Sequence, residues 1–171
     1  MAIKSMMEGR ALNMAAERPS LHDAAMEITP TDGPDVRLAV PFFGVKDVDV
    51  SLRFYVEDLG FRITRQWAPE GRIRWCWIEL GSAAVMLQEY RNDGRPDGWP
   101  AGPIGQGVSI CFICGDALAM YHHAKARGLE PSRPFVGNNL WVTSLADPDG
   151  FRLEFESPTD VPEGTVYADE M

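Results

Sequence analysis

Aromatic side chains able to bind a planar ligand occur along much of the sequence. Trp75 and Trp77 stand two apart in a strand-like run, so both point to one face while Cys76 and Ile78 point to the other. On an open face, two indoles form a stacking platform for a planar or cationic ligand; the alternative is packing in a core. Three more tryptophans are candidate cleft residues, at a strand end, in a connector rich in Pro and Gly, and at a strand start: Trp67, Trp99 and Trp141.

Carboxylates in strand-like runs are the second group of candidate binding residues. In the alternating run 151–156, we expect the apolar side chains to pack beneath a helix and Arg152, Glu154 and Glu156 to face a cleft or solvent. Glu154 then either pairs with a neighbouring arginine or receives a cationic group of a ligand. Glu89 adds negative charge to the site if it faces inward, and otherwise lies in solvent.

Residue patterns for covalent catalysis are missing from the sequence. There is no G-x-S-x-G, no phosphate-binding P-loop and no H-E-x-x-H. Cys76, Cys111 and Cys114 lie in apolar runs, and we interpret them as buried thiols of a cytoplasmic protein. His122 and His123 fall on an expected helix, away from the strands, so no Cys–His pair is predicted.

The charge of the chain argues against two classes of partner. A formal net charge of −9 over 171 residues disfavours nucleic acid and anionic membranes, because phosphate binding depends on clustered Lys and Arg. No apolar stretch reaches the roughly 18–20 residues of a membrane-spanning helix. The net charge is −3 in residues 1–36, −4 in 158–171 and only −2 in 37–157. The acidity therefore supports solubility more than the binding of a cation.

The elements that must position these residues follow from hydrophobic periodicity and turn signals. Two helices are expected, capped by Asp47 and Asp116 and ended by Gly60 and Gly128. The expected strands cover 37–45, 61–67, 73–80, 83–90, 108–114, 129–133, 140–146 and 151–157, and the helices cover 47–58 and 116–127.

This order is a β-α-β-β-β unit that occurs twice, which predicts an α+β fold. One unit is too small to close a core, so two together should form a curved mixed sheet with a concave ligand cleft and both helices on the outer face. We divide the chain into a partly irregular extension, a domain over 37–157 and an acidic tail over 158–171. The domain comprises modules 37–90 and 107–157 joined by the connector 91–106; the extension, 1–36, includes one helix near 5–17.

Two runs resemble the start and the end of the vicinal oxygen chelate superfamily: FFGVKDVDVSLRFYVEDLGF at 42–61 and LADPDGFRLEFES at 145–157. That superfamily includes glyoxalase I, extradiol dioxygenases, and fosfomycin and bleomycin resistance proteins. The resemblance implies four metal-ligand positions, which fall here on Val40, Leu87, Val108 and Glu154. Three apolar residues cannot hold a divalent cation, and we expect the neighbouring Gln88 to point to the other face. No metal and no other cofactor is therefore predicted.

VMLQEY, SICFICGDALAMYHHAKARG and DPDG are spaced as in the bleomycin-resistance-like branch of that superfamily. This similarity implies a homodimer that binds a small molecule at its interface. We expect an apolar cleft floor made of Phe42, Val85, Leu87, Val108 and Ile110. The predicted function is metal-free sequestration of an aromatic or cationic antibiotic-like ligand. The alternatives are a glyoxalase- or dioxygenase-like metal enzyme with a non-standard ligand set, and a metabolite-binding module.

Overall fold

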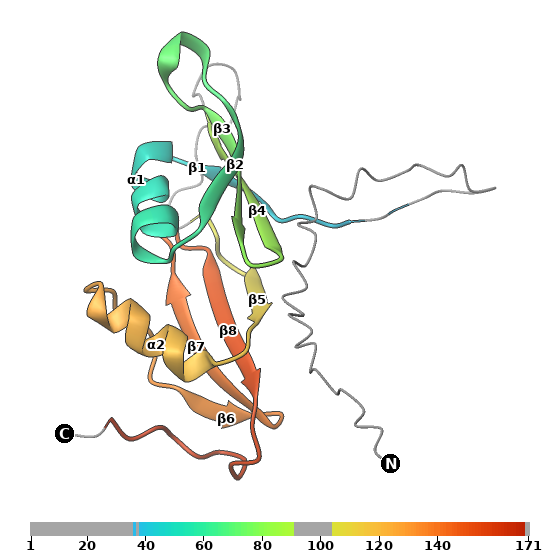
Figure 1. Ribbon diagram of the computed structural model, residues 1–171, viewed down its shortest axis with the longest axis vertical. Helices are drawn as coiled ribbons and strands as arrows, with labels where there is room; N and C mark the ends of the chain where they lie inside the picture. Colours follow the sequence, from blue (N-terminus) through green and yellow to red (C-terminus); the bar gives the residue numbers. More distant parts are fainter. Residues whose placement is uncertain (1–35, 37, 91–103, 170–171) are drawn as a thin grey trace, which may run out of the picture. The chain divides into compact units, whose positions relative to one another are not determined.

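The first half of the fold is one β-α-β-β-β module (Figure 1). The computed structural model describes residues 36, 38–90 and 104–169. Short α-helix α1 continues directly into a turn of π-helix, η1, and a 3-10 turn, η2, joins the second and third strands. The bounds are β1 Phe42–Val45, α1 Val48–Leu52, η1 Arg53–Asp58, β2 Arg62–Trp67, η2 Pro69–Gly71, β3 Trp75–Leu80 and β4 Ala83–Glu89.

The second half repeats this order with a longer helix and a shorter second strand. Its elements are β5 Ser109–Ile113, α2 Ala117–Ala126, β6 Phe135–Gly137, β7 Leu140–Ala146 and β8 Arg152–Pro158. The strand expected over 129–133 is wrong, and β6 lies further along the chain. Pro131 and Pro134 lack the amide hydrogen that a strand ladder needs, so pairing begins only after the second of them.

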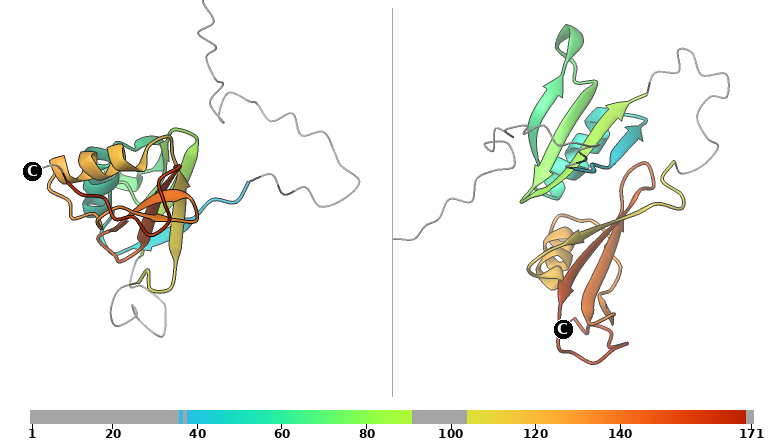
Figure 2. Two further views of the ribbon diagram at one scale, coloured as in Figure 1. Left: turned by 90° about the horizontal axis from the view of Figure 1, so that it is seen from below. Right: turned by 90° about the vertical axis from the view of Figure 1, so that its right-hand side faces the viewer.

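Each module forms a four-stranded mixed sheet, in the orders β1-β4-β3-β2 and β5-β8-β7-β6. The first strand of each module pairs in parallel with the last, and the other neighbours are antiparallel. The helices lie on one side of their sheets (Figure 2), with α1 against β4 and α2 against β7 and β8. The predicted α+β class and duplicated order are confirmed, although the strands form two sheets where one was expected.

Both predicted helix caps are confirmed. Asp47 accepts hydrogen bonds from the amides of Asp49 and Val50, and Asp116 accepts one from Ala119. An N-cap carboxylate satisfies amides that have no partner inside the helix, which fixes where each helix begins. In the described part of the chain, no helix has the length and apolar character needed to cross a membrane.

The hydrophobic core extends across both modules, as expected for units too small to close a core alone. The ring of Phe43 on β1 stacks on Phe151 with centroids 4.0 Å apart, and Phe61 meets the edge of Phe112 at 5.9 Å. Tyr55 on η1 is fully buried and donates a hydrogen bond to Asp147 at 3.0 Å. Module one therefore anchors directly on the turn between β7 and β8.

The segment after β8, expected to be a tail, contacts the second module over residues 159–169. Val136 on β6 donates to the carbonyl of Thr165, and Val166 bridges Phe135. The ring of Tyr167 meets Trp141 edge-on at 6.0 Å, and Asp169 pairs with Lys125 at 3.0 Å. The segment covers the outer edge of β6.

Candidate functional site

The aromatic residues predicted from the strand pattern gather on the face of the first sheet that points away from α1. We call this the open face, and the corresponding side of the second sheet, away from α2, its open face. Trp75 and Trp77 are partly exposed there, whereas Cys76 and Ile78, which alternate with them along β3, are fully buried. The prediction that the two tryptophans share one face, with Cys76 and Ile78 on the other, is confirmed, and of the two alternatives for that face the structure shows the open one.

Strand register arranges this open face in rows across the sheet, because paired residues point to the same side. One row runs from β1 to β2 through Gly44, Gln88, Trp75 and Trp67, and the next through Phe42, Met86, Trp77 and Arg65. Phe42 is 50% exposed and Trp67 is 57% exposed. We name these two rows, together with Tyr90, the aromatic face.

Trp77 is held in place by two charged neighbours. The guanidinium of Arg65 lies over its ring, 5.3 Å from the centroid, and its Nε1 donates to Glu79 Oε1 at 2.8 Å. A cation over one face of an indole and a bond at its edge restrict the side chain. Trp77 therefore acts as a fixed wall of the aromatic face.

Tyr90 enters the aromatic face because Gly44 lacks a side chain. A Cβ placed on Gly44 would lie 1.5 Å from Cε2 of Tyr90, so the tyrosine ring fills the space over β1. The amide of Tyr90 also donates to the carbonyl of Val45, which fixes its backbone beside this strand. Only the pairing of β1 with β4 brings these two residues together, so the sequence pattern gave no signal of it.

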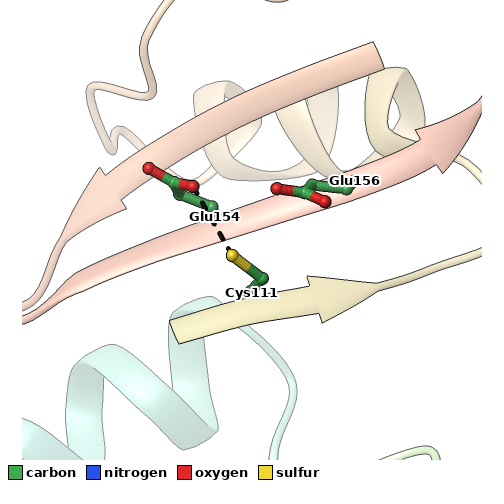
Figure 3. A group of neighbouring side chains, drawn as sticks. All are labelled: Cys111, Glu154 and Glu156. Carbon is green, nitrogen blue, oxygen red and sulfur yellow. Dashed lines mark hydrogen bonds between the residues drawn. The ribbon is translucent and has the colours of Figure 1, made fainter. Parts of the chain in front are cut away.

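The second sheet presents a different chemistry on its open face, drawn in Figure 3. Cys111 on β5 lies opposite Glu154 on β8 and donates to its Oε2 at 3.6 Å, and Glu154 also pairs with Arg152 at 2.6 Å. Glu156 is two residues further along β8 on the same side. The expectation that Glu154 faces away from the core is confirmed, and its pairing with arginine matches one of its two interpretations.

Cys111 is exposed, so the prediction of a buried thiol is wrong for this residue. Desolvation and the neighbouring carboxylates of Glu156 and Glu154 raise the pKa of the Cys111 thiol to about 11. Thiolate is the reactive form of cysteine, and little of it is present near neutral pH at such a pKa.

We expect iodoacetamide to modify Cys111 slowly at pH 8, about 100-fold more slowly than a thiol of pKa 9, because two pKa units change the thiolate fraction by that factor. The rate should increase about tenfold per pH unit above pH 8. Peptide mass spectrometry measures it, with Cys111→Ser as the control. The double variant Glu154→Gln/Glu156→Gln should react faster than the native protein; an equal rate would contradict the role of the carboxylates.

Three of the four residues that the resemblance assigned to metal positions offer no ligand atom. Leu87 is fully buried in the core, and Val40 and Val108 offer only hydrocarbon. Among the residues described, the side chains of Cys111, Glu154 and Glu156 are the group whose ligand atoms converge, all within 4.8 Å. One member of this group is a thiol of raised pKa and another is neutralised by Arg152, so the group lacks the imidazole and carboxylate set of the superfamily.

Three residues assigned to the cleft floor point the other way. Val85 and Leu87 are fully buried in the core, and Ile110 packs against the same core. Leu87 pairs with Cys76 and Phe43, which also belong to the core, whereas Gln88 pairs with Trp75 on the open face. The strand faces predicted for these side chains are therefore wrong: Val85, Leu87 and Ile110 face the core, and Gln88 faces the open side.

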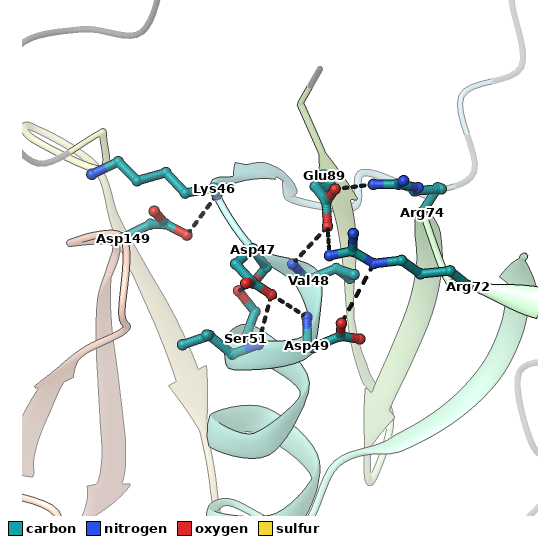
Figure 4. Close-up of polar contacts among 10 residues, drawn as sticks. Lys46, Asp47, Val48, Asp49, Ser51, Arg72, Arg74, Glu89 and Asp149 are labelled. Carbon is teal, nitrogen blue, oxygen red and sulfur yellow. Dashed lines mark hydrogen bonds and ion pairs between the residues drawn. The ribbon is translucent and has the colours of Figure 1, made fainter. Parts of the chain in front are cut away.

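Glu89 also lies away from the open face, at the start of α1 (Figure 4). Its carboxylate accepts from the amide of Val48 at 3.3 Å and from Arg72 at 2.9 Å, and it forms a second ion pair with Arg74. With its side chain 10% exposed, it is engaged on every side by these groups. The expectation that Glu89 supplies negative charge to the cleft is wrong.

The remaining predicted site residues divide between the two sheets and the regions around them. Phe42, Trp67, Trp75 and Trp77 share the aromatic face, and Glu154 belongs to the other sheet. Val108 is 45% exposed just before β5. Trp141 pairs with Ser157, whose hydroxyl accepts a hydrogen bond from the amide of Ala117 at the start of α2. Trp141 therefore lies on the helix side, and the prediction that it is a cleft residue is wrong. Trp99 lies outside the described residues.

Comparison with known proteins places this arrangement in a family. Residues 37–155 match the profile described as the Glyoxalase/Bleomycin resistance protein/Dioxygenase superfamily. Among solved structures, TioX from Micromonospora sp. ML1 is 20% identical with a TM-score of 0.55, covering 70% of this chain and 96% of that one.

Two further structures share the fold. TnmS3 from Streptomyces sp. CB03234, described as an antibiotic binding protein, is 21% identical with a TM-score of 0.55 and covers 74% of this chain and 100% of its own. A superfamily protein from Nocardioides is 17% identical with a TM-score of 0.56, covering 79% of this chain and 93% of its own. No curated protein gives a match. The match over residues 37–155, together with the duplicated β-α-β-β-β order, shows that this chain belongs to the Glyoxalase/Bleomycin resistance protein/Dioxygenase superfamily.

Proposed function

We propose that this protein binds and sequesters a small planar aromatic ligand without a metal ion. The aromatic face carries the proposal, because Phe42 and Trp67 expose half or more of their surfaces beside the partly exposed Trp75 and Trp77. A set of exposed indole and phenyl rings on one sheet face is typical of a binding surface. The antibiotic-binding relative TnmS3 supports an antibiotic-like ligand.

The proposal includes a homodimer as the binding form and the cytoplasm as its location. A homodimer would place the aromatic face of one copy opposite the open face of its partner's second sheet, so that the ligand lies between two copies. A small molecule is then the binding partner, and nucleic acid is not. The free thiols of Cys76, Cys111 and Cys114 suit the cytoplasm.

The test is a calorimetric titration with a panel of aromatic and cationic glycopeptide antibiotics, after a first screen by tryptophan fluorescence. We expect at least one compound to bind, and Trp75→Leu to weaken it about tenfold to thirtyfold, since buried tryptophans contribute disproportionately to affinity. Trp141→Phe is the matched control, because Trp141 lies on the helix side and contacts Tyr167. Binding that is absent, or weakened equally by both variants, would overturn the proposal.

Elemental analysis of the same protein, purified without chelator, tests the metal-free part. We expect well under one equivalent of Zn, Ni, Mn or Fe. The described open faces offer a neutral amide at Gln88 and a carboxylate at Glu154 that is paired with Arg152, in place of the imidazole and carboxylate ligands of the superfamily. One full equivalent that is lost in the Glu154→Gln/Glu156→Gln variant would instead favour a metal enzyme using the group of Cys111, Glu154 and Glu156.

A further inference from the structure

We propose that Gln88 is the polar specificity residue of the aromatic face, and that it selects a neutral planar ligand with a hydrogen-bonding edge. This inference rests on the proposed function and narrows its ligand class. Gln88 lies on β4 in the row between Gly44 and Trp75, partly exposed on the open face. Its neighbours on both sides are aromatic, since the ring of Tyr90 fills the space over Gly44.

Among the described residues, the charged groups nearest to this row are already engaged with protein partners. Arg65 covers one side of Trp77, and Glu79 accepts from the indole Nε1 of the same residue. Glu89, next to Gln88 in sequence, points to the other side of the sheet and is held by two arginines. The charges around the row therefore serve to position the protein's own side chains.

Gln88 differs from these groups in its bonding. Within the described part of the chain, its amide makes no hydrogen bond to another residue and forms no ion pair. A primary amide offers two donor hydrogens and a carbonyl acceptor, so it can bind either a carbonyl or an N–H group. Because the amide is neutral, it does not favour a cationic ligand over a neutral one.

The spacing of the side chains in this row indicates which class of ligand can reach the Gln88 amide. Same-face side chains on adjacent strands lie about 5 Å apart, so a ring system of three fused rings that covers Trp75 and Tyr90 also passes over Gln88. Such a ligand gains stacking from the two rings and a directed bond from the amide between them. A site of this kind fixes the ligand's orientation through one polar group in an apolar surface.

Two probes of equal ring size distinguish the effect of a hydrogen-bonding edge on affinity from the effect of a positive charge. Acridone is neutral and carries a carbonyl and an N–H, whereas 9-aminoacridine is a cation near pH 7. For the native protein we expect acridone to bind more tightly. Gln88→Met keeps side-chain length and removes the amide, so it should weaken acridone about tenfold and change 9-aminoacridine less than about twofold.

Gln88→Glu supplies the reciprocal test, because a carboxylate in the same place should favour the cation and reverse the order of the two probes. Gln66→Met is the matched control: Gln66 is exposed and pairs with buried Cys76, so it does not belong to the aromatic face. It should leave both affinities unchanged. Calorimetry measures the affinities, and circular dichroism checks that each variant is folded.

The outcomes distinguish this inference from the proposed function. If the probes bind and Trp75→Leu weakens them, but Gln88→Met affects both probes equally or neither, the role of Gln88 is overturned and the aromatic site stands. If 9-aminoacridine binds more tightly than acridone to the native protein, the neutral ligand class is overturned. If neither probe binds the folded protein, the planar-ligand site falls, and the inference about Gln88 falls with it.

Discussion

Replacing Asp147 with alanine is expected to lower the free energy of unfolding by about 3–5 kcal/mol, because it leaves three buried donors without a partner. The Oδ1 of Asp147 accepts from the amides of Asp149 at 2.9 Å and Phe151 at 2.8 Å, and Oδ2 accepts from the Tyr55 hydroxyl at 3.0 Å. Asp147 is only 4% exposed, so water cannot take over these bonds easily. Urea unfolding followed by circular dichroism measures the loss.

Asp147→Asn is the informative companion variant. Its Oδ1 can still accept from both backbone amides, and its NH2 group can donate to the Tyr55 oxygen, so the loss should stay below about 1.5 kcal/mol. Asp160→Ala, at an exposed aspartate, controls for removal of charge and should change stability by less than about 0.5 kcal/mol. Equal losses from the alanine and asparagine variants would contradict the assigned bonding.

The same carboxyl gives stability a pH dependence of defined sign. Burial raises the pKa of Asp147 above its ordinary 3.8, and hydrogen bonds from Phe151 and Tyr55 oppose only part of that shift. The folded chain then holds this proton more tightly than the unfolded chain, so the stabilisation is complete below pH 3.8 and is lost as the pH rises through the folded pKa. Stability of the native protein relative to Asp147→Asn should therefore increase as the pH falls from 7 toward 4.

Glu89→Ala is expected to cost about 2–3 kcal/mol, the second-largest effect. It removes the acceptor of the Val48 amide at the start of α1 and the acidic partner that Arg74 shares with Arg72. Arg72 then keeps only its ion pair with Asp49 at 3.5 Å. The value lies below that of a fully buried pair because the arginine side chains are 45% and 21% exposed. Chemical unfolding again provides the measurement.

Glu89→Gln should lose about half as much, because the amide oxygen can still accept one of these bonds. Glu57→Ala, an exposed glutamate on η1, is the control and should be nearly neutral. A loss below about 0.5 kcal/mol for Glu89→Ala would mean that the ion pairs of Figure 4 contribute no net stability in solution.

Local signals in the sequence were sufficient for the order and type of most elements. The helix caps at Asp47 and Asp116 are set by residues within three positions, and β7 occupies the predicted 140–146. The alternation of β8 could also be assigned, because Leu153 and Phe155 differ sharply in polarity from Glu154 between them. Period-two patterns define a face only where such contrast exists.

The phase of β4 could not be assigned in this way. Ala83–Glu89 is apolar on both sides over most of its length, so Leu87 and Met86 were equally suited to the core. Pairing of Leu87 with Phe43 and Cys76 decides between them, and those contacts join residues far apart in sequence. A slip of one residue reverses every side chain of a strand, which is why Gln88 and Tyr90 were missed as site residues.

Trp141 was misplaced for a related reason, since its partner Tyr167 lies in a segment with no strand or helix pattern. That segment has a consequence of its own. Residues 159–169 cover the edge strand β6 of the second sheet, whereas at the opposite edge strand, β5, the side chain of Ile113 is 71% exposed. Unpaired strand borders are where sheets join other chains. In the described part of the chain, β5 is therefore the edge strand at which this sheet can pair with another chain, which gives any strand-to-strand association of the second module a fixed direction.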